Sequence, residues 1–422
     1  MTDLLIHNLS EVATPVGNGP RSGAHQAAVH RLAGHEVLVR NGRIAFVGTP
    51  EERQRQHGDL VETPRLDGEG GTLVPGFVDP HTHLPWAGNR EDEFARRLAG
   101  ATYQEIAATG GGILATVHAT REASEGELSE KVLRRLDHML IHGTTTAEAK
   151  SGYGLNLDDE LKQLRAIQQA TEAHPVDLVP TLLAAHEVPL EYRDRRDAFV
   201  DLVCEEIVPA TAEAGLARFC DVFCERGVFS AEESRRVLTA GAVHGLKPRL
   251  HADEFVDSGG AELAAELGAL SADHLIAISD AGIAALAGSG VTAVLLPGTS
   301  FFLMKHHYAP ARRLIEAGVP VALATDCNPG SSYTESLPMV FVLAVFELGL
   351  SIEESLTAAT LNAAACLGLG GEIGSIEAGK RADLVLLDAP NLLHMAYHYG
   401  VNPVKTVIKH GRIAYRAAKV ER

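Results

Sequence analysis

Short apolar runs alternate with longer amphipathic stretches through the middle of this chain. The apolar runs with the length of buried strands are 73–78, 144–149, 178–183, 219–223, 248–251, 271–274, 293–296 and 320–324. Helical periodicity lies between several of them, as in 129–141, 158–173, 231–244 and 280–287. This alternation is typical of repeated βα units and a parallel sheet. Eight such units in about 250 residues predict a (β/α)8 barrel.

A doubly wound open sheet is the structural alternative. Such folds commonly place a glycine-rich nucleotide motif directly after the first strand. No such motif follows the run 73–78. The barrel is therefore the favoured interpretation.

The two ends of the chain resemble each other more than either resembles the middle. Residues 36–48 predict two strands around the turn Asn41-Gly42, and residues 405–415 repeat this pattern around His410-Gly411. Residues 374–388 predict a further strand pair. An isolated hairpin would leave an apolar face uncovered. We therefore expect an α/β protein with a distorted TIM-type barrel, residues 75–371, and a small β-sandwich domain built from both termini, residues 1–74 plus 372–422.

Composition excludes several classes of protein. The 422 residues are 45% hydrophobic and 22% charged, as in a soluble globular protein. The net charge of −18 argues against a nucleic-acid-binding protein, and an anionic substrate would need a local cationic group. Five irregularly spaced cysteines do not form a disulfide framework, and no segment has the length of a membrane span. These features predict a cytoplasmic protein with reduced thiols.

Metal-binding side chains fall at the ends of several predicted strands. His81 and His83 follow the first strand, and their spacing would place both on one side of an extended chain. His251 ends the fifth strand, His274 the sixth and Asp326 the eighth. A barrel carries its chemistry at this edge. Imidazoles with one carboxylate suit zinc or iron(II) and leave a position for water.

Each of these residues also has an ordinary structural interpretation. A single histidine at a strand end is commonly a hydrogen-bonded core residue, and a single aspartate there commonly caps the next helix. Five such placements on one edge favour a metal site over that explanation.

These positions carry a resemblance to a known family. The chain resembles the amidohydrolase superfamily, whose members carry His-Xaa-His after strand one and His, His and Asp after strands five, six and eight. Within it, the chain is most similar to the enzymes that hydrolyse the ring amide of 4-imidazolone-5-propanoate to N-formimino-L-glutamate in histidine degradation. The motifs that carry the closer similarity are 81–84, 87–90, 93–94, 100–103, 110–113, 150–155, 184–186, 251–254 and 325–330.

The resemblance implies a site for one divalent metal ion per subunit. Zn²⁺ or Fe²⁺/Fe³⁺ would be held by four ligands, His81, His83, His251 and Asp326. Some members bridge two metals with a lysine after strand four, but residues 221–225 contain none. Lys150 follows the second strand instead, and its plain interpretation is a surface or loop-anchoring cation.

The resemblance also implies a set of substrate contacts. Arg90 can pair with a carboxylate through two parallel hydrogen bonds, and it would take the propanoate tail together with Tyr153. Residues alone would favour Arg90 as a solvated loop charge. The other implied contacts are His186, Glu254, Asn328, Gly330 and Ser331.

Three residues are the candidates for catalysis. Glu254, three residues after His251, would face away from the metal if the strand continued, so we predict that the chain leaves strand geometry near residue 252 or 253. Asp326 and Glu254 are competing candidates for the general base. His274 would polarise the substrate carbonyl or stabilise the oxyanion.

Two alternative functions remain open at this point. The first is another amidohydrolase, such as a deaminase or cyclic amidohydrolase, although a deaminated base has no carboxylate for Arg90 and Tyr153. The second is a catalytically inactive barrel scaffold, although no ligand or proton-transfer residue is missing. We expect a small-molecule substrate with a carboxylate tail, no nucleic acid, no membrane association and a possible homodimer.

Overall fold

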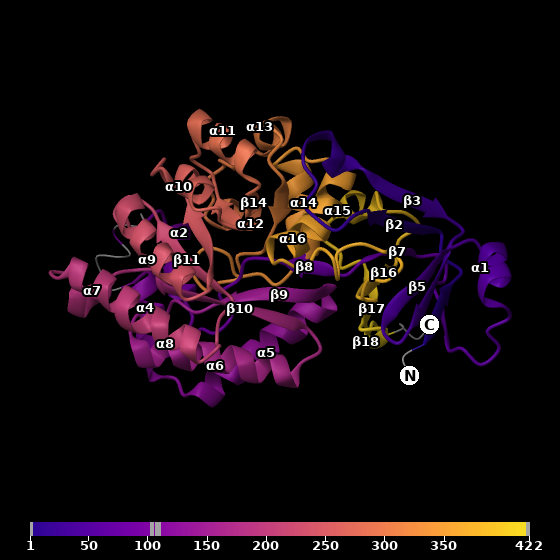
Figure 1. The fold of residues 1–422 in the computed structure, drawn as a ribbon, viewed down its shortest axis with the longest axis horizontal. Coiled ribbons are helices and arrows are strands. Elements are labelled where there is room, and N and C mark those ends of the chain that lie inside the picture. The colour runs from indigo at the N-terminus through magenta and orange to yellow at the C-terminus, as the bar shows by residue number, and fades with distance from the viewer. Residues whose placement is uncertain (1–2, 102–104, 106–110, 419–422) are drawn as a thin grey trace.

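The computed structural model describes residues 3–101, 105 and 111–418, and its centre is a parallel β-sheet of eight strands (Figure 1). The strands follow one another around the sheet in chain order. They are β8 (Phe77–Asp79), β9 (Thr144–Lys150), β10 (Asp177–Ala185), β11 (Phe219–Cys224), β12 (Lys247–Ala252), β13 (Ser271–His274), β14 (Thr292–Leu295) and β15 (Val321–Leu323). The predicted barrel is confirmed, and its second to eighth strands lie within two residues of the predicted bounds.

The first and last strands meet at the carboxyl-terminal rim. No ladder joins β8 to β15, but Thr82 and Cys327 form a parallel bridge just beyond them. The amide of Asp326 donates to the carbonyl of His81 (3.1 Å), and the amide of His83 donates to the carbonyl of Cys327 (3.0 Å). The distorted barrel is thus joined at the edge where the candidate ligands lie.

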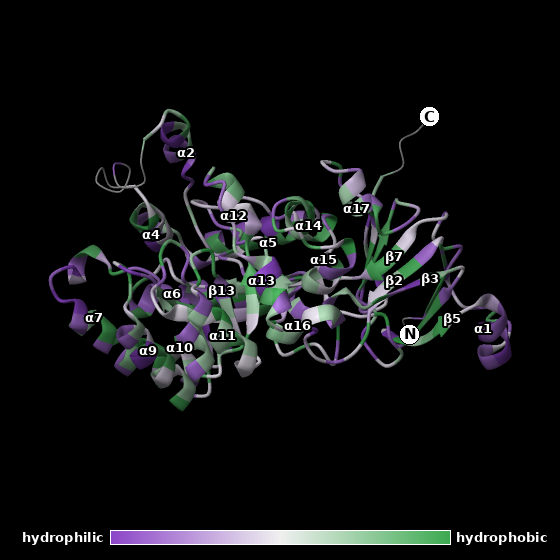
Figure 2. Ribbon diagram, turned by 90° about the horizontal axis from the view of Figure 1, so that it is seen from above, coloured by the Kyte–Doolittle hydropathy of each residue, from purple (hydrophilic) through white to green (hydrophobic). Residues whose placement is uncertain are grey.

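Helices cover the outside of the barrel, with hydrophobic and hydrophilic positions intermixed along them (Figure 2). Several begin at the position that their sequence specifies: Ser124 and Ser230 each accept the amide of a glutamate three residues on, which also bonds back. The helices along the barrel are α2 (Glu91–Leu98), α4 (Ile113–Glu122), α5 (Glu125–Ile141), α6 (Leu157–Ala173), α7 (Arg196–Leu202), α8 (Val208–Glu213), α9 (Ala231–Val243), α10 (Gly260–Glu266), α11 (Asp280–Ser289), α12 (Pro297–Phe302), α13 (Ala311–Glu316), α14 (Leu337–Phe346), α15 (Ile352–Ala359) and α16 (Leu361–Cys366).

Two further sheets form the predicted β-sandwich beside the barrel. One contains β1 (Leu4–His7), β4 (Glu36–Arg40), β5 (Arg43–Gly48) and β6 (Arg65–Asp67), all from the amino-terminal end. The other combines both ends of the chain: β2 (Glu11–Pro15), β3 (Val29–Ala33), β7 (Thr72–Pro75), β16 (Leu384–Leu387), β17 (Val404–Lys409) and β18 (Arg412–Arg416). Their facing side chains share one buried core that includes Ile6, Val39, Leu73, Leu384 and Ile408. Helices α1 (Pro50–His57) and α17 (His394–Tyr397) lie at the periphery (Figure 2).

Two strand predictions were wrong. The run 73–78 is not one barrel strand: it divides at Gly76 into β7, which pairs with β16 of the sandwich, and β8, which pairs with β9 of the barrel. The amide of Gly76 donates to the carbonyl of Asp383 (2.8 Å), and a Cβ at this glycine would collide with Thr145. The segment 374–388 contains the single strand β16 rather than a pair.

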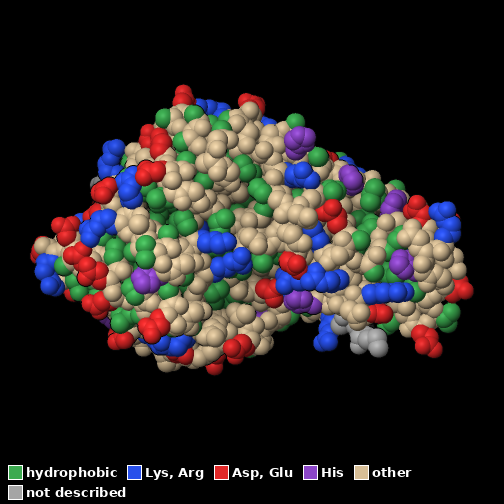
Figure 3. All heavy atoms as spheres, viewed as in Figure 1, with side chains coloured by type: hydrophobic (Ala, Val, Ile, Leu, Met, Phe, Trp, Pro, Cys, Tyr) green, Lys and Arg blue, Asp and Glu red, His purple; other side chains and the backbone are tan. Residues whose placement is uncertain are grey.

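The charged residues, the cysteines and the apolar segments of the sequence can each be located in the structure. On the face shown in Figure 3, acidic and basic side chains are interspersed. All five cysteines are free thiols, and four of them are buried. Among the described residues, no helix combines the length and the apolarity that crossing a membrane requires.

Candidate active site

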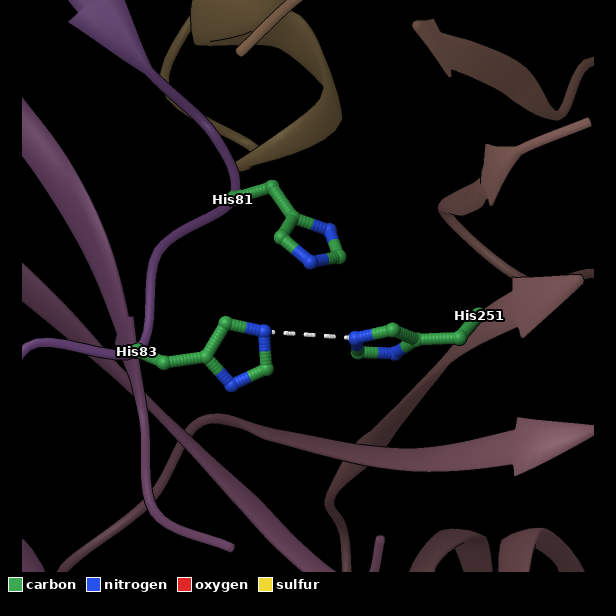
Figure 4. A group of neighbouring side chains, drawn as sticks. All are labelled: His81, His83 and His251. Atoms are coloured by element: carbon green, nitrogen blue, oxygen red, sulfur yellow. Dashed lines mark hydrogen bonds between the residues drawn. The ribbon is translucent and has the colours of Figure 1, made fainter. Parts of the chain in front are cut away.

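The four predicted metal ligands converge at the carboxyl-terminal rim of the barrel. Figure 4 shows His81 and His83, from the loop after β8, turned toward His251 at the end of β12. The Nε2 atoms of His83 and His251 are 3.4 Å apart. Asp326 Oδ1 lies 3.5 Å from His81 Nε2 and 3.4 Å from His83 Nε2. All four side chains are buried.

Unpartnered atoms within this group indicate what it can hold. His81 Nε2 and Asp326 Oδ1 are buried without a hydrogen-bond partner. Buried polar atoms nearly always have a partner in folded proteins, so these atoms fit ligation of a cation. Burial, with the charge of Lys150, holds the pKa of His81 well below its usual range, and burial with His251 does the same for His83. Both rings are therefore neutral, the form that binds a transition metal.

Three side chains behind the ligands orient them. Asp273 Oδ2 lies 2.6 Å from His81 Nδ1, and Asp221 Oδ2 lies 3.1 Å from His251 Nδ1, so the Nε2 atom of each ring is left free. Thr299 Oγ1 donates to Asp326 Oδ2 (2.6 Å). Sequence reasoning missed all three. For the two aspartates, a charged residue inside a predicted strand was the available signal.

His274 lies beside this group and shares its surroundings. Its ligand atoms, with those of His81 and Asp326, lie within 4.8 Å of one another, and both of its nitrogens are without a partner. Burial lowers its pKa to about 3, so the ring is neutral. Its backbone is left-handed, with φ of 77°, a conformation that is unusual away from glycine and concentrates at functional sites.

Glu254 reaches the site through the predicted turn. Strand β12 ends at Ala252, and Asp253 has φ of 52°, which reverses the chain. Glu254 Oε2 then lies 3.9 Å from His274 Nδ1, in a buried position. Burial and, next, the charge of Asp326 raise the pKa of Glu254 above its ordinary value.

Arg90 is enclosed rather than solvated. Its side chain is 9% exposed, and Nε and Nη2 donate to Glu93 Oε2 at 2.9 and 2.8 Å. A Cβ at Gly330 would collide with the guanidinium group, so the two residues are in close contact. The commoner interpretation of Arg90, a solvated loop charge, was therefore wrong.

Two predicted substrate contacts lie against the ligand His83. The ring of His186 stacks on it with centroids 5.2 Å apart, and the ring of Tyr153 lies 6.0 Å away. His186 Nδ1 lies 2.9 Å from the carbonyl of Gly152, so Nε2 is not used in this contact. Burial raises the pKa of Tyr153, so its hydroxyl remains a donor at neutral pH.

Asn328 and Ser331 belong to the loop after the ligand Asp326. Asn328 Oδ1 accepts the amides of Gly330 and Ser331, both at 2.8 Å, and its Nδ2 donates to the carbonyl of Asp326 (2.7 Å). Ser331 Oγ lies 3.5 Å from Asp326 Oδ2. Asn328 thus shapes this loop, and the loop in turn places Gly330 against Arg90.

Two further expectations from the sequence concern Lys150 and the glycine-containing motifs 100–103 and 110–113. Lys150 is not a surface cation, because it is fully buried beneath the site. The motifs 100–103 and 110–113 fall partly outside the described residues.

Comparisons with known proteins place this site in a family. The amidohydrolase family model matches residues 72–414. An imidazolonepropionase of Geobacillus sp. (strain WCH70) is 52% identical, with both chains covered in full. The imidazolonepropionase of Symbiobacterium thermophilum is 53% identical over 100% of this chain and 99% of its own.

Solved structures show the same fold at lower identity. The 5-methylcytosine deaminase of Klebsiella pneumoniae superposes with a TM-score of 0.74 at 18% identity and covers 99% of this chain and 98% of its own. A zinc-bound adenosine deaminase of Xanthomonas campestris gives a TM-score of 0.69 at 21% identity, covering 97% and 92%.

Proposed function

Because the chain belongs to the amidohydrolase family, we infer that its rim pocket hydrolyses the ring amide of 4-imidazolone-5-propanoate. The product is N-formimino-L-glutamate, and the reaction is a step of histidine degradation. The observation that carries this function is the sequence similarity to imidazolonepropionases, which extends over the whole chain at 52% and 53% identity. The structure agrees with it, because the histidines and Asp326 lie together at the rim of the barrel.

A divalent metal ion fits the buried ligand set. His81, His83, His251 and Asp326 would hold one ion per subunit, and both Zn²⁺ and iron suit three imidazoles with one carboxylate. When bound, the metal supplies a water of lowered pKa. Asp273, Asp221 and Thr299 keep the free ligand atoms turned to one point.

The carboxylate tail of the substrate has a cationic partner. Arg90 Nη2 and Nε are held by Glu93, which fixes the plane of the guanidinium group, and Gly330 lies against the same group. Tyr153 donates its hydroxyl to the same carboxylate. His186, stacked on His83, contacts the ring with its free nitrogen.

Glu254 is the better placed of the two candidate bases. Asp326 has a role for each oxygen in this site, since Oδ2 accepts from Thr299 and Oδ1, which faces the histidines without a hydrogen-bond partner, would bind the metal. The carboxyl of Glu254 lies 3.9 Å from His274 and is not a candidate ligand, and its raised pKa suits a group that takes the water proton and returns it to the ring nitrogen when the carbon–nitrogen bond breaks. His274, a neutral ring beside Glu254, donates to the carbonyl oxygen as it gains charge.

A turnover assay tests this function. The purified protein, loaded with Zn²⁺ or Fe²⁺, is incubated with 4-imidazolone-5-propanoate, and N-formimino-L-glutamate is measured. We expect turnover that requires the metal. Metal-loaded protein that leaves the imidazolone intact but releases ammonia from a purine or pyrimidine would favour the deaminase alternative. Metal analysis of the protein as purified separates zinc from iron.

We also propose a cytoplasmic homodimer with two domains, residues 1–74 plus 372–422 and residues 75–371. Exposed apolar side chains gather at the end of α14 and around α17, a composition that suits a second copy. They are Phe346, Leu393, Tyr397, Tyr399 and Val401. Light scattering of the wild type and of Tyr397→Ser with Tyr399→Ser tests this, because the dimer should dissociate in the double variant.

A further inference from the structure

Five charged side chains are completely buried inside the barrel, beneath the metal ligands. They lie on four strands, two on β9 and one each on β11, β12 and β13: Glu148, Lys150, Asp221, Arg249 and Asp273. Burying charges is costly unless they are paired, so their arrangement needs a reason. None of them is a proposed ligand or substrate contact.

Lys150 is the hub of this cluster. Its Nζ lies 2.7 Å from Glu148 Oε1, 2.7 Å from Asp221 Oδ2 and 3.9 Å from Asp273 Oδ2. One ammonium group therefore faces three carboxylates from three different strands. Arg249 supports one of them from the other side, because its Nη2 lies 3.2 Å from Asp273 Oδ2 and donates to the carbonyl of Pro80 (2.7 Å).

Two of these carboxylates are the groups that orient metal ligands. Asp221 contacts His251 Nδ1 at 3.1 Å, and Asp273 contacts His81 Nδ1 at 2.6 Å. Glu148 extends the same arrangement to the ligand loop, since its Oε2 accepts the amide of Thr82 (3.1 Å), between the two histidines of that loop. Each of the three carboxylates near Lys150 thus also contacts a candidate metal ligand or the loop that carries two of them.

We propose that Lys150 is a positioning residue for the metal centre: it holds Asp221 and Asp273 where they aim His251 and His81 at the ion. The proposal rests on the metal ligands assigned under the proposed function. Without this ammonium group, three buried carboxylates would face one another with only Arg249 to compensate them. Asp221 would move away, and His251 would lose its orientation.

Electrostatics alone predicts the opposite effect of removing Lys150. A cation near a metal site repels the ion, so its loss would strengthen metal binding if charge were its main contribution. Positioning predicts weaker binding, because loss of an outer-shell partner costs 10- to 100-fold in metal affinity. The sign of the change therefore separates the two roles.

The test measures metal release from the loaded enzyme into excess chelator, without any turnover. Lys150→Met should release zinc about 10- to 100-fold faster than the wild type, and Lys150→Arg should restore part of the retention. The visible spectrum of the cobalt(II)-substituted protein should change in Lys150→Met, because the ligand geometry changes. Release at the wild-type rate, or slower release, would overturn the proposal.

A matched control is available in the sandwich. Lys409 on β17 is also buried between two carboxylates, with Nζ 2.8 Å from Asp177 Oδ2 and 2.7 Å from Asp383 Oδ2. Lys409→Met makes the same change of charge and should lower thermal stability without altering metal release. Equal acceleration in both variants would attribute the effect to general destabilisation and refute the positioning role.

A second variant covers the case in which Lys150→Met does not fold. Asp221→Asn keeps the size of the side chain and removes the charge that pairs with Lys150, so it should also accelerate release. If the wild-type protein retains zinc but does not turn over the imidazolone, the proposed reaction is refuted, but metal release from the variants and the wild type can still be compared. A wild type that retains no metal would refute the ligand assignment and this proposal together.

Discussion

The guanidinium group of Arg90 lies against the Cα of Gly330, so closely that no side chain fits between them. The two residues lie in the loops after β8 and β15, the first and last strands of the barrel, which meet at one rim. The position of Arg90, the proposed partner of the substrate carboxylate, therefore depends on a glycine 240 residues away in the sequence.

Replacing Gly330 with alanine should displace Arg90 and weaken substrate binding. A displacement of about 1 Å at a binding group can cost on the order of 100-fold, and we expect a loss of roughly 10- to 100-fold in kcat/KM, mostly as a raised KM. Gly371→Ala is the control, since a Cβ there meets no atom within 4 Å. Steady-state kinetics decide the prediction, and an unchanged KM in Gly330→Ala would contradict it.

Replacing His274 with alanine should depress turnover while metal content stays close to that of the wild type. Loss of a group that stabilises the developing oxyanion costs about 100- to 1,000-fold in kcat. Elemental analysis is the second measurement, because His274 lies within the distance at which it could ligate. His251→Ala, which removes a ligand, should lose metal. If His274→Ala loses metal to the same extent, His274 is a ligand and not a polarising group.

Replacing Glu254 with glutamine should lower kcat by about 100- to 10,000-fold, the contribution of a positioned proton carrier. Because burial and Asp326 raise the pKa of Glu254, its ionisation belongs above the ordinary range of glutamates. The wild-type profile of kcat/KM should therefore rise with pH in that region, and the variant should lack this rise. If Glu254→Gln keeps the wild-type pH profile, Glu254 is not the general base, and Asp326 becomes the candidate.

Replacing Asp177 with asparagine should destabilise the contact between barrel and sandwich. Burial alone would raise the pKa of Asp177, but His410, Lys409 and Arg381 around it bring the pKa below its ordinary value. A lowered pKa means that the carboxylate contributes stability above its unfolded pKa and loses it as the pH falls through the folded one.

The expected cost of Asp177→Asn is roughly 1 kcal/mol at pH 7, a modest figure because the side chain is 33% exposed. Denaturant unfolding at several pH values measures it. The difference from the wild type should shrink below about pH 4. Asp388→Asn, at an 82% exposed carboxylate, is the control and should have almost no effect at any pH.

The sequence predicted the barrel well because each βα unit is a local pattern. Seven of the eight strands lie within two residues of their predicted bounds, and His81, His83, His251, His274 and Asp326 all lie at or just beyond the carboxyl ends of barrel strands, as expected. The division of the run 73–78 could not be predicted, because both halves are equally apolar. Only the partners of β7 and β8, far away in the chain, distinguish them.

The supporting residues of the site were harder to predict for a similar reason. Asp221, Asp273 and Lys150 act through contacts between strands that are widely separated in sequence. A charged residue in a strand indicates that it has a partner, but not which one. The turn at Asp253 was predictable because the position of Glu254 required it.

The junction at Gly76 also has a consequence for how the protein is made. Strand β7 leads within a few residues to His81, yet its partner β16 is among the last strands to be synthesised. A ribosome extends the chain from its amino terminus, so β7, which directly precedes β8 and the two histidines, has no antiparallel partner until synthesis is almost finished. A chain that stops short of β16 would retain every candidate ligand in its sequence and still lack the strand that pairs with β7, the strand leading into the first barrel strand.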